Sequence, residues 1–448
     1  MSFIKKNKTI FLILLLVANQ NNSSAQGTWE RLNSPTTENL NSVYFVDSSY
    51  GWAAGNSGVI IHTSNGGNDW VMQDSKTENN ILDIFFLNHN IGWAVSWEVM
   101  NYPFGTYVLK TTDGGLNWNS SPFPEENIFS QCILFQDSLD GWMGGKPYPI
   151  VRTTDGGISW TEAVIDSSTY STYPVYDIKF FNSKFGYASG GVFDCCGIMW
   201  RTTNGGNYWF VSDTPNISID AFYQLFVIDS MNVIGVGGDF EPLGLGVELA
   251  RTSNGGITWE FNYIGIEGAA WDIDFRTSRE AWASLRGNAN LIYSSDSGIN
   301  WTQVQTPDSA LIFNITFPDS LHGFGIGTDG TIIKYKPDIS SVQNEKEFIP
   351  EKIVLYQNYP NPFNSTTKIK FEIPLSPPLL KRESEAGGFV TLKVYDILGT
   401  EVATLVDEEL AVGSYEIDFV AEKLSSGIYF YTLSVSDFIS SKKMILLR

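Results

Sequence analysis

Three aspartates stand at one repeated position of this sequence and have the chemistry that acid–base catalysis requires. Asp83, Asp177 and Asp272 fall on alternate copies of a short β-pattern. The seven residues at this position are Ser42, Asp83, Cys132, Asp177, Gln224, Asp272 and Asn314. Two carboxylates that face each other across a cleft, about 5–10 Å apart, can hydrolyse a glycosidic bond. The three aspartates are therefore candidate catalytic residues, and as a cluster they would also suit a cation or sugar hydroxyls.

The same position also fits a purely structural role. Each polar residue comes just before an alternating stretch such as Asp177-Ile-Lys-Phe180, which predicts that an inner strand starts there. We expect these side chains to surround the mouth of a central channel, where they can cap strand starts or bond to a neighbouring repeat. No motif fixes a pair at catalytic separation, so we favour the structural role.

A second phrase, Ser/Thr-x-Asp/Asn-x-Gly-x-x-Trp, occurs six times and predicts the elements that position these residues. Its tryptophans are 48, 42, 49, 50 and 42 residues apart, which is the length of a four-stranded propeller blade. The acid or amide accepts hydrogen bonds from the following backbone and glycine supplies positive φ, so the phrase predicts a tight turn. We therefore assign a structural role to the six box residues, Asn65, Asp113, Asp155, Asn204, Asn254 and Asp296.

The two repeats differ in number, and the difference predicts how the ring closes. Seven inner-strand copies accompany six complete boxes. The segment 327–335 reads as the third strand of the last blade, and no fourth strand follows it. Residues Thr28-Trp29-Glu30 read as a fourth strand, and no first three strands precede it. Pairing the two segments leaves no long exposed edge. The fold class is therefore all-β, with a seven-bladed propeller over residues 27–336.

Aromatic residues gather in the loops opposite the box turns. These loops are where a regular scaffold most often carries function, and exposed aromatics among acids suit sugar rings or extended peptides. Tyr176 and Tyr223 lie in the same connections. The alternative is that these side chains fold inward and seal the long loops. The candidate ligand-binding residues are Trp97, Tyr102, Phe104, Tyr107, Tyr173, Phe240 and Trp271.

Composition and the N-terminus indicate an exported protein. Residues 1–25 read as a secretory signal peptide, because lysines precede a short apolar run and a Ser-Ser-Ala end. The apolar run is too short for a membrane span. The net charge of -21 disfavours nucleic acid as a partner. Three cysteines and three histidines without metal-ligand spacing predict no metal and no cofactor. We expect a monomer, with Cys195 and Cys196 either free or bonded to each other.

A separate module follows the propeller. Residues 337–348 read as a linker, and residues 349–448 predict a small Ig-like β-sandwich. Its Tyr359-Pro-Asn-Pro-Phe-Asn364 and Ser425-Ser-Gly-Ile-Tyr429 motifs resemble the type A C-terminal sorting domain of the type IX secretion system. One departure from the family is the long segment 375–388, which has the composition of a flexible loop. The resemblance implies passage through the periplasm, recognition of residues 349–448 by the translocon, and release or display at the cell surface.

The propeller resembles the Asp-box, or BNR-repeat, family. Its Thr-Thr-Asp-Gly-Gly-x-x-Trp spelling is most similar to the photosystem II stability/assembly-factor-like branch. The fold is shared with sialidases and xyloglucan hydrolases, so it does not determine function. A sialidase needs three arginines that converge on the substrate carboxylate. Arg152, Arg201 and Arg251 instead stand at the same position of three different blades, immediately before the box, so the sequence argues against a sialidase. We favour a secreted or surface propeller that binds a glycan, peptide or protein through its aromatic and acidic loops. The alternative is a polysaccharide hydrolase with a carboxylate pair at the channel mouth.

Overall fold

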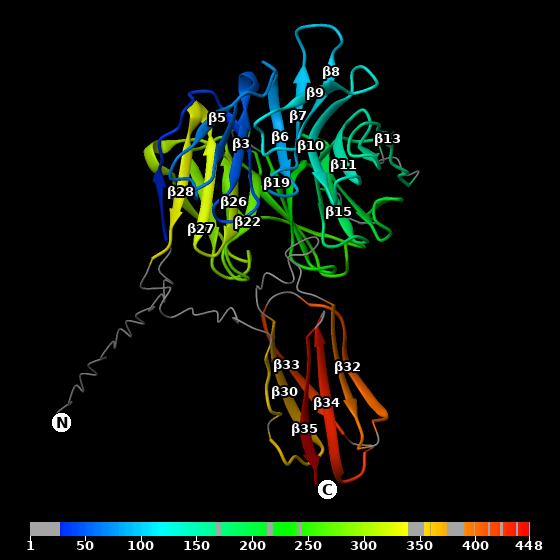
Figure 1. Cartoon of the computed structure of the whole chain (residues 1–448). Coiled ribbons are helices and arrows are strands. Elements are labelled where there is room, and N and C mark those ends of the chain that lie inside the picture. Colours follow the sequence, from blue (N-terminus) through cyan, green and yellow to red (C-terminus); the bar gives the residue numbers. More distant parts are fainter. Residues whose placement is uncertain are drawn as a thin grey trace, which may run out of the picture.

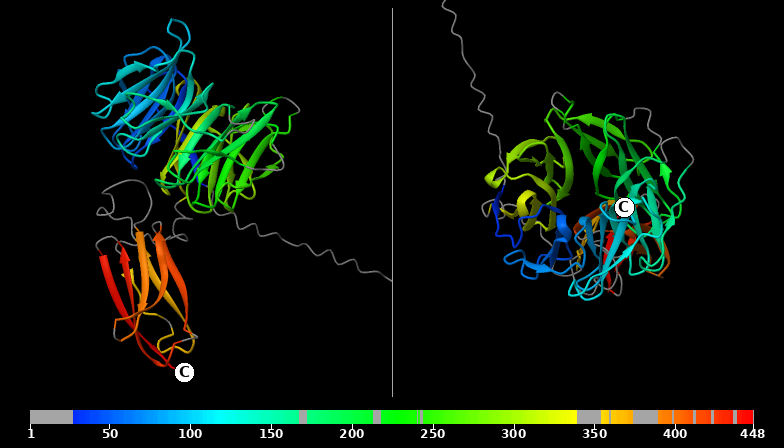
Figure 2. Two further views of the ribbon diagram at one scale, coloured as in Figure 1. Left: turned by 90° about the vertical axis from the view of Figure 1, so that its right-hand side faces the viewer. Right: turned by 90° about the horizontal axis from the view of Figure 1, so that it is seen from above.

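The computed structural model is an all-β protein with a propeller followed by a sandwich (Figure 1). The described residues between 27 and 336 form seven four-stranded antiparallel sheets, which follow one another around a ring when seen from above (Figure 2). The predicted fold class and number of blades are confirmed. The residues that the structure describes are 27–166, 172–212, 218–239, 241, 244–338, 354–358, 360–373, 389–397, 399–410, 413–421, 424–435 and 438–447.

The blades are built in chain order, with the innermost strand first. Blade 1 consists of β2 (Leu40–Phe45), β3 (Gly51–Gly55), β4 (Ile60–Thr63) and β5 (Val71–Gln73). Blade 2 consists of β6 (Asn80–Phe86), β7 (Gly92–Glu98), β8 (Gly105–Thr111) and β9 (Asn119–Pro122). Blade 3 consists of β10 (Phe129–Phe135), β11 (Gly141–Lys146), β12 (Ile150–Thr153) and β13 (Thr161–Glu162). Blade 4 consists of β14 (Val175–Phe180), β15 (Gly186–Val192), β16 (Cys196–Thr202) and β17 (Phe210–Val211).

The remaining blades repeat this order until the ring closes. Blade 5 consists of β18 (Phe222–Val227), β19 (Val233–Gly238), β20 (Val247–Thr252) and β21 (Glu260–Tyr263). Blade 6 consists of β22 (Ala269–Phe275), β23 (Ala281–Arg286), β24 (Asn290–Ser294) and β25 (Thr302–Gln305). Blade 7 consists of β26 (Ile312–Asp319), β27 (His322–Gly327), β28 (Ile332–Lys336) and β1 (Thr28–Arg31). Three single turns of 3-10 helix are η1 (Asn56–Gly58), η2 (Pro307–Ser309) and η3 (Thr328–Gly330).

The first strand closes the ring, as the sequence predicts. Strand β1 pairs antiparallel with β28, and Trp29 lies opposite Tyr335. Lys336 adds an ion pair with Glu30 across the same two strands. Blade 7 therefore joins the two ends of the propeller segment without a covalent link, and β28 has no open edge.

In five blades a glycine is followed by an aromatic residue near the start of the second strand, and this pair explains how neighbouring blades pack. The Trp52 ring stacks on Phe86 of the next blade, with ring centroids 3.6 Å apart and planes 9° apart. A Cβ atom on Gly92, on the other side of Phe86, would lie 2.5 Å from that ring, so only glycine fits there. The same pattern returns where blade 7 meets blade 1, since Phe324 stacks on Phe45 at 4.2 Å.

The C-terminal module is a two-sheet sandwich over a common apolar core. One sheet has the order β29-β30-β33 and the other has the order β32-β31-β34-β35. The strands are β29 (Val354–Leu355), β30 (Thr366–Ile373), β31 (Phe389–Tyr395), β32 (Glu401–Glu409), β33 (Gly413–Val420), β34 (Gly427–Val435) and β35 (Phe438–Leu446).

The Pro-Asn-Pro-Phe motif of this module lies along the outer edge of β35. The Asn361 side-chain oxygen accepts a hydrogen bond from the Ile445 amide at 2.9 Å. The backbone of Phe363 donates to Ile445 and accepts from Leu447, both at 2.9 Å. The motif therefore covers backbone groups that an edge strand would otherwise expose. In the part of the chain that the structure describes, no helix has the length and apolarity to cross a membrane.

Candidate functional site

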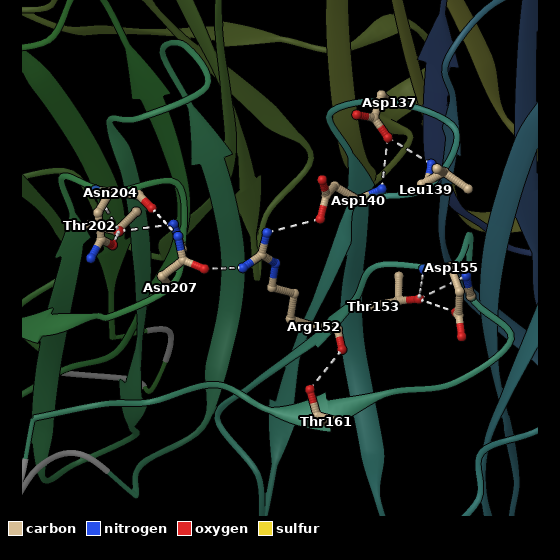
Figure 3. Close-up of polar contacts among 12 residues, drawn as sticks. Asp137, Leu139, Asp140, Arg152, Thr153, Asp155, Thr161, Thr202, Asn204 and Asn207 are labelled. Atoms are coloured by element: carbon tan, nitrogen blue, oxygen red, sulfur yellow. Dashed lines mark hydrogen bonds and ion pairs between the residues drawn. The ribbon is translucent and has the colours of Figure 1, made fainter.

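The box residues form turns at one face of the propeller. Thr153 donates a hydrogen bond from Oγ1 to Asp155 Oδ1 at 2.8 Å and accepts one from the Gly157 amide at 3.0 Å (Figure 3). Asp155 also accepts from the Ser159 hydroxyl and amide, and these bonds lower its pKa to about 2. The hydroxyl-to-Oδ1 bond recurs in all six boxes, at Asn65, Asp113, Asp155, Asn204, Asn254 and Asp296. The carboxylate and amide oxygens are thus used within the turns.

The basic residues just before the boxes join one blade to the next. Arg152 forms an ion pair with Asp140 at 2.9 Å and donates to Asn207 of blade 4, as Figure 3 shows. Lys110 and Lys334 donate to box carbonyl oxygens of the following blade, at 2.8 and 2.7 Å. Arg251 makes the same kind of bond to Gly298. These cations do not converge on one ligand, which agrees with the argument against a sialidase site.

The three candidate catalytic aspartates lie inside the innermost strands rather than before them. Each accepts a hydrogen bond from a backbone amide of the next blade. Asp83 accepts from Ile133 at 2.8 Å. Asp177 accepts from Leu225 at 2.9 Å, and Asp272 accepts from Ile315 at 2.5 Å. Asn314 repeats this bond to Val43 at 2.8 Å where blade 7 meets blade 1. The arrangement supports the structural role, in which one side-chain oxygen joins two inner strands.

Lys179 supplies a positive charge among these aspartates. Its Nζ lies 3.6 Å from Asp177 Oδ1. Burial disfavours the charged form of Lys179, but the negative field of the surrounding carboxylates outweighs burial and raises its pKa above the ordinary value. In falling order of influence these carboxylates are Asp177, Asp272, Asp83 and Asp274. Among the described residues, no group of three or more His, Cys, Asp or Glu side chains is placed to hold a metal ion.

The buried carboxyl of Asp272 makes stability depend on pH. Burial raises the pKa of Asp272 from 3.8 to about 7, against the opposing effects of the Ile315 amide and Lys179. The folded state therefore holds a proton that the unfolded chain releases near pH 3.8. We expect the free energy of unfolding to fall as the pH rises from 3.8 to about 7, because deprotonation then places a charge in the interior. In Asp272→Asn, the free energy of unfolding should fall less steeply over this pH range. Urea unfolding at a series of pH values measures the slope.

A matched control is Asp113→Asn on the box face. A hydrogen bond from Asn117 lowers the pKa of Asp113, so its titration lies below the same pH window. This variant should keep the slope of the unsubstituted protein. Equal slopes in Asp272→Asn and the unsubstituted protein would show that Asp272 does not carry the effect.

One residue of each innermost strand is bulged out of the ladder, immediately before the polar position. The pairing register shifts at this residue in all seven blades. A bulge redirects a side chain and is common next to functional sites. The seven bulged residues are Asn41, Leu82, Gln131, Tyr176, Tyr223, Trp271 and Phe313. They all lie at the loop end of the channel, opposite the boxes.

Four consecutive bulged residues form an aromatic arc, defined as Tyr176, Tyr223, Trp271 and Phe313. The ring centroids of Tyr176 and Tyr223 are 5.5 Å apart, and those of Tyr223 and Trp271 are 5.6 Å apart. Trp271 and Phe313 follow at 6.1 Å. All four side chains are half-buried. The arc thus offers a continuous aromatic surface that spans blades 4 to 7.

Two polar groups belong to this surface. The guanidinium of Arg286, an exposed residue at the end of β23, lies 4.0 Å from the centroid of the Trp271 ring. The indole N–H of Trp271 is buried and donates to none of the described residues. Burial, the neighbouring Tyr176, and the charges of Asp220 and Asp239 raise the pKa of Tyr223 to about 12, although Arg286 opposes them. Arg286 thus supplies positive charge at the centre of the arc, and Asp220 and Asp239 supply negative charge that acts on Tyr223.

The structure places the predicted ligand-binding residues in several different environments. Tyr102 and Phe104 are 72% and 39% exposed at the tip of the β7–β8 hairpin, which extends beyond its neighbours in Figure 1. Trp97 instead donates its indole N–H to the Ser130 carbonyl at 2.6 Å, and Tyr107 lies within β8. Tyr173 lies beside the thiols of blade 4. Phe240 lies outside the described residues.

Trp271 is thus the one predicted ligand residue that belongs to the arc. Tyr176 and Tyr223 belong to the arc as well, and they lie within β14 and β18 rather than in the connections that the sequence predicted. Phe313 and Arg286 were missed by sequence reasoning. The position just before each polar residue could have revealed Phe313, because the same position carries Tyr176, Tyr223 and Trp271 in the three preceding blades.

Comparison with known proteins shows the same two modules. Residues 68–215 and 243–336 match the family described as photosynthesis system II assembly factor YCF48, and residues 357–447 match the secretion system C-terminal sorting domain. The photosystem II stability/assembly factor HCF136 of Arabidopsis thaliana is 25% identical over 290 residues, which are 51% of this chain and 70% of that protein.

Solved structures share the fold. The structure of YCF48 bound to D1 peptide has a TM-score of 0.55 and 20% identity, and it covers 70% of this chain and 98% of its own. A GH74 xyloglucanase from Xanthomonas campestris has a TM-score of 0.55 and 10% identity, and it covers 92% of this chain and 66% of its own. The family matches span more than half of the chain. The chain therefore belongs to the photosynthesis system II assembly factor YCF48 family, and it carries a secretion system C-terminal sorting domain that indicates export by the type IX system.

Proposed function

We propose that the exported propeller is a binding module that holds an extended peptide segment of a partner protein at the channel mouth. The observation that carries this proposal is the aromatic arc. Aromatic residues dominate the energetic centres of protein interfaces, because they bury a large area at little entropic cost. Here four of them touch in sequence around one edge of the channel, and a bulge directs each one there.

The charges around the arc favour a segment that carries lysine or arginine. Asp220 and Asp239 act on Tyr223, and Asp194 and Asp239 act on Asp220. The chain as a whole has a net charge of -21, which attracts positively charged partners. A cationic side chain can also pack on an aromatic face, as Arg286 already does on Trp271.

The relatives support a peptide as the class of ligand. A YCF48 propeller has been solved with a bound D1 peptide. Its 20% identity to this chain extends only to the fold, so the peptide sequence itself does not transfer. Hydrolysis of a polysaccharide has less support, because Asp83, Asp177 and Asp272 each use a carboxylate oxygen to bond the next blade.

Binding to a panel of unstructured peptides tests the proposal. The full chain would be titrated with fluorescent peptides that differ only in lysine content, and with neutral xyloglucan and cello-oligosaccharides. We expect micromolar binding to the lysine-containing peptides, weaker binding at higher salt, and none to the glycans. Binding of the neutral glycans with none to any peptide would overturn the proposal and favour a carbohydrate site.

A further inference from the structure

The hairpin between β15 and β16 places two adjacent cysteines at the loop end of blade 4. Val192 and Cys196 form the last pair of the ladder, and the Cys195 amide closes the turn onto the Val192 carbonyl at 3.1 Å. Asp194 adopts positive φ, 55°, which makes the turn tight. The turn thus fixes the direction of both cysteine side chains.

The two thiols face each other at this tip. Cys195 Sγ and Cys196 Sγ are 2.8 Å apart. Cys195 is exposed, whereas Cys196 is 3% exposed and belongs to the apolar core between blades 3 and 4. Neighbouring residues lie about 3.8 Å apart at Cα, which is closer than most bridged cysteines. A bond between them therefore requires their sulfurs to be directed toward each other in advance, and the turn does this.

Tyr173 covers the pair from the loop that precedes blade 4. Its hydroxyl makes hydrogen bonds to both thiols, and these bonds raise the pKa of Tyr173 to about 12. Burial raises the pKa of the Cys196 thiol to about 11. Cys196 is therefore protonated at neutral pH, and the exposed Cys195 is the sulfur that an external reagent reaches.

We propose that Cys195 and Cys196 are joined in a vicinal disulfide in the exported protein. Compartments outside the cytoplasm are oxidising, and disulfides persist there. The oxidant is a disulfide of the thiol-exchange class. Cys195 loses its proton, attacks one sulfur of the oxidant and forms a mixed disulfide, while the first external thiolate leaves and takes up a proton. Cys196 then gives up its proton as it attacks Cys195 Sγ and displaces the second external thiolate, which is protonated in turn. Two protein thiols and one external disulfide thus yield one protein disulfide and two external thiols.

The bond would make blade 4 rigid beside the binding surface. Tyr173 contacts the sulfurs and precedes Tyr176, the first member of the aromatic arc, by three residues. A closed ring at residues 195 and 196 removes rotational freedom from the side chains on which Tyr173 rests. This inference is independent of the proposed peptide ligand, since the bond can be measured without any ligand.

Thiol counting tests the disulfide, because the chain holds only one other cysteine. Protein secreted through the type IX pathway would be denatured without reductant and reacted with Ellman's reagent. We expect one thiol per chain, from Cys132, and an intact mass lower than that of the reduced chain by two hydrogen atoms. Three thiols and the full reduced mass would overturn the proposal.

Two variants and a second reaction keep the test decisive. Cys132→Ala should titrate no thiol, whereas Cys195→Ser should titrate two. After reduction, the folded protein should return to one thiol when oxidised glutathione is added, while Cys132 stays unreactive because it is buried. Failure of the reduced, folded protein to close under this oxidant would also overturn the assignment.

Discussion

Replacement of Trp29 by alanine is expected to lower the free energy of unfolding by about 3 kcal/mol. Trp29 packs edge-on against three rings, with centroid distances of 5.4 Å to Trp282, 5.6 Å to Phe317 and 5.4 Å to Tyr335. These contacts hold β1 in blade 7, and β1 is joined to β28 by hydrogen bonds, side-chain packing and the Lys336–Glu30 ion pair, without a covalent link. Loss of the indole therefore weakens the closure of the whole ring. Urea unfolding followed by circular dichroism measures the change.

Trp301→Ala is the matched control for ring closure. Trp301 is the half-buried box tryptophan of blade 6. It lies just before β25, and the box turn joins β25 covalently to β24. Both variants lose an indole, whereas only Trp29→Ala loosens the edge of β28. Amide hydrogen exchange should therefore accelerate in β28 of Trp29→Ala and remain slow there in Trp301→Ala. Equal exchange in the two variants would show that Trp29 contributes packing without closing the ring.

The architecture could be predicted because its determinants repeat along the chain. A turn of Asp or Asn with glycine occurs in six blades, and a Gly-aromatic pair beside an inner phenylalanine occurs in five, and each pattern has one physical explanation. Counting the two repeats against each other was enough to assign Trp29 to blade 7. The sandwich could also be predicted from local motifs. The structure adds the hydrogen bonds that the motif residues Asn361 and Phe363 make along β35.

The site was harder to predict because it depends on register and on distance around the ring. Alternation of polar and apolar residues does not show a bulge, so the sequence placed Asp177 before its strand instead of within it. The bulge also directs Tyr176, and its neighbours Tyr223 and Trp271 are 47 and 95 positions away in the chain. Only the packing of neighbouring blades in a defined register brings such residues into contact. Loop composition directed attention to the end of the channel where the arc lies, but it did not show which aromatic side chains meet there.

Trp271→Ala is expected to weaken binding of a lysine-containing peptide by about 2 kcal/mol, roughly 30-fold in Kd. Trp271 lies between Tyr223 and Phe313 and packs against Arg286, so its loss divides the arc in two. Trp271→Phe keeps an aromatic ring of smaller area, and we expect an intermediate loss. Fluorescence anisotropy with the labelled peptide gives the Kd of each variant.

Two further variants locate the binding surface. Leu116→Ala alters a residue that is 79% exposed on the box face, so the Kd should stay unchanged. Tyr102→Ala removes the exposed ring of the β7–β8 hairpin, which lies on blade 2 and is not part of the arc. If the peptide binds at the arc, Trp271→Ala must weaken binding more than Tyr102→Ala does. A larger loss of binding in Tyr102→Ala than in Trp271→Ala would place the peptide on the hairpin. The two variants separate the two sites because the arc and the hairpin tip belong to different blades.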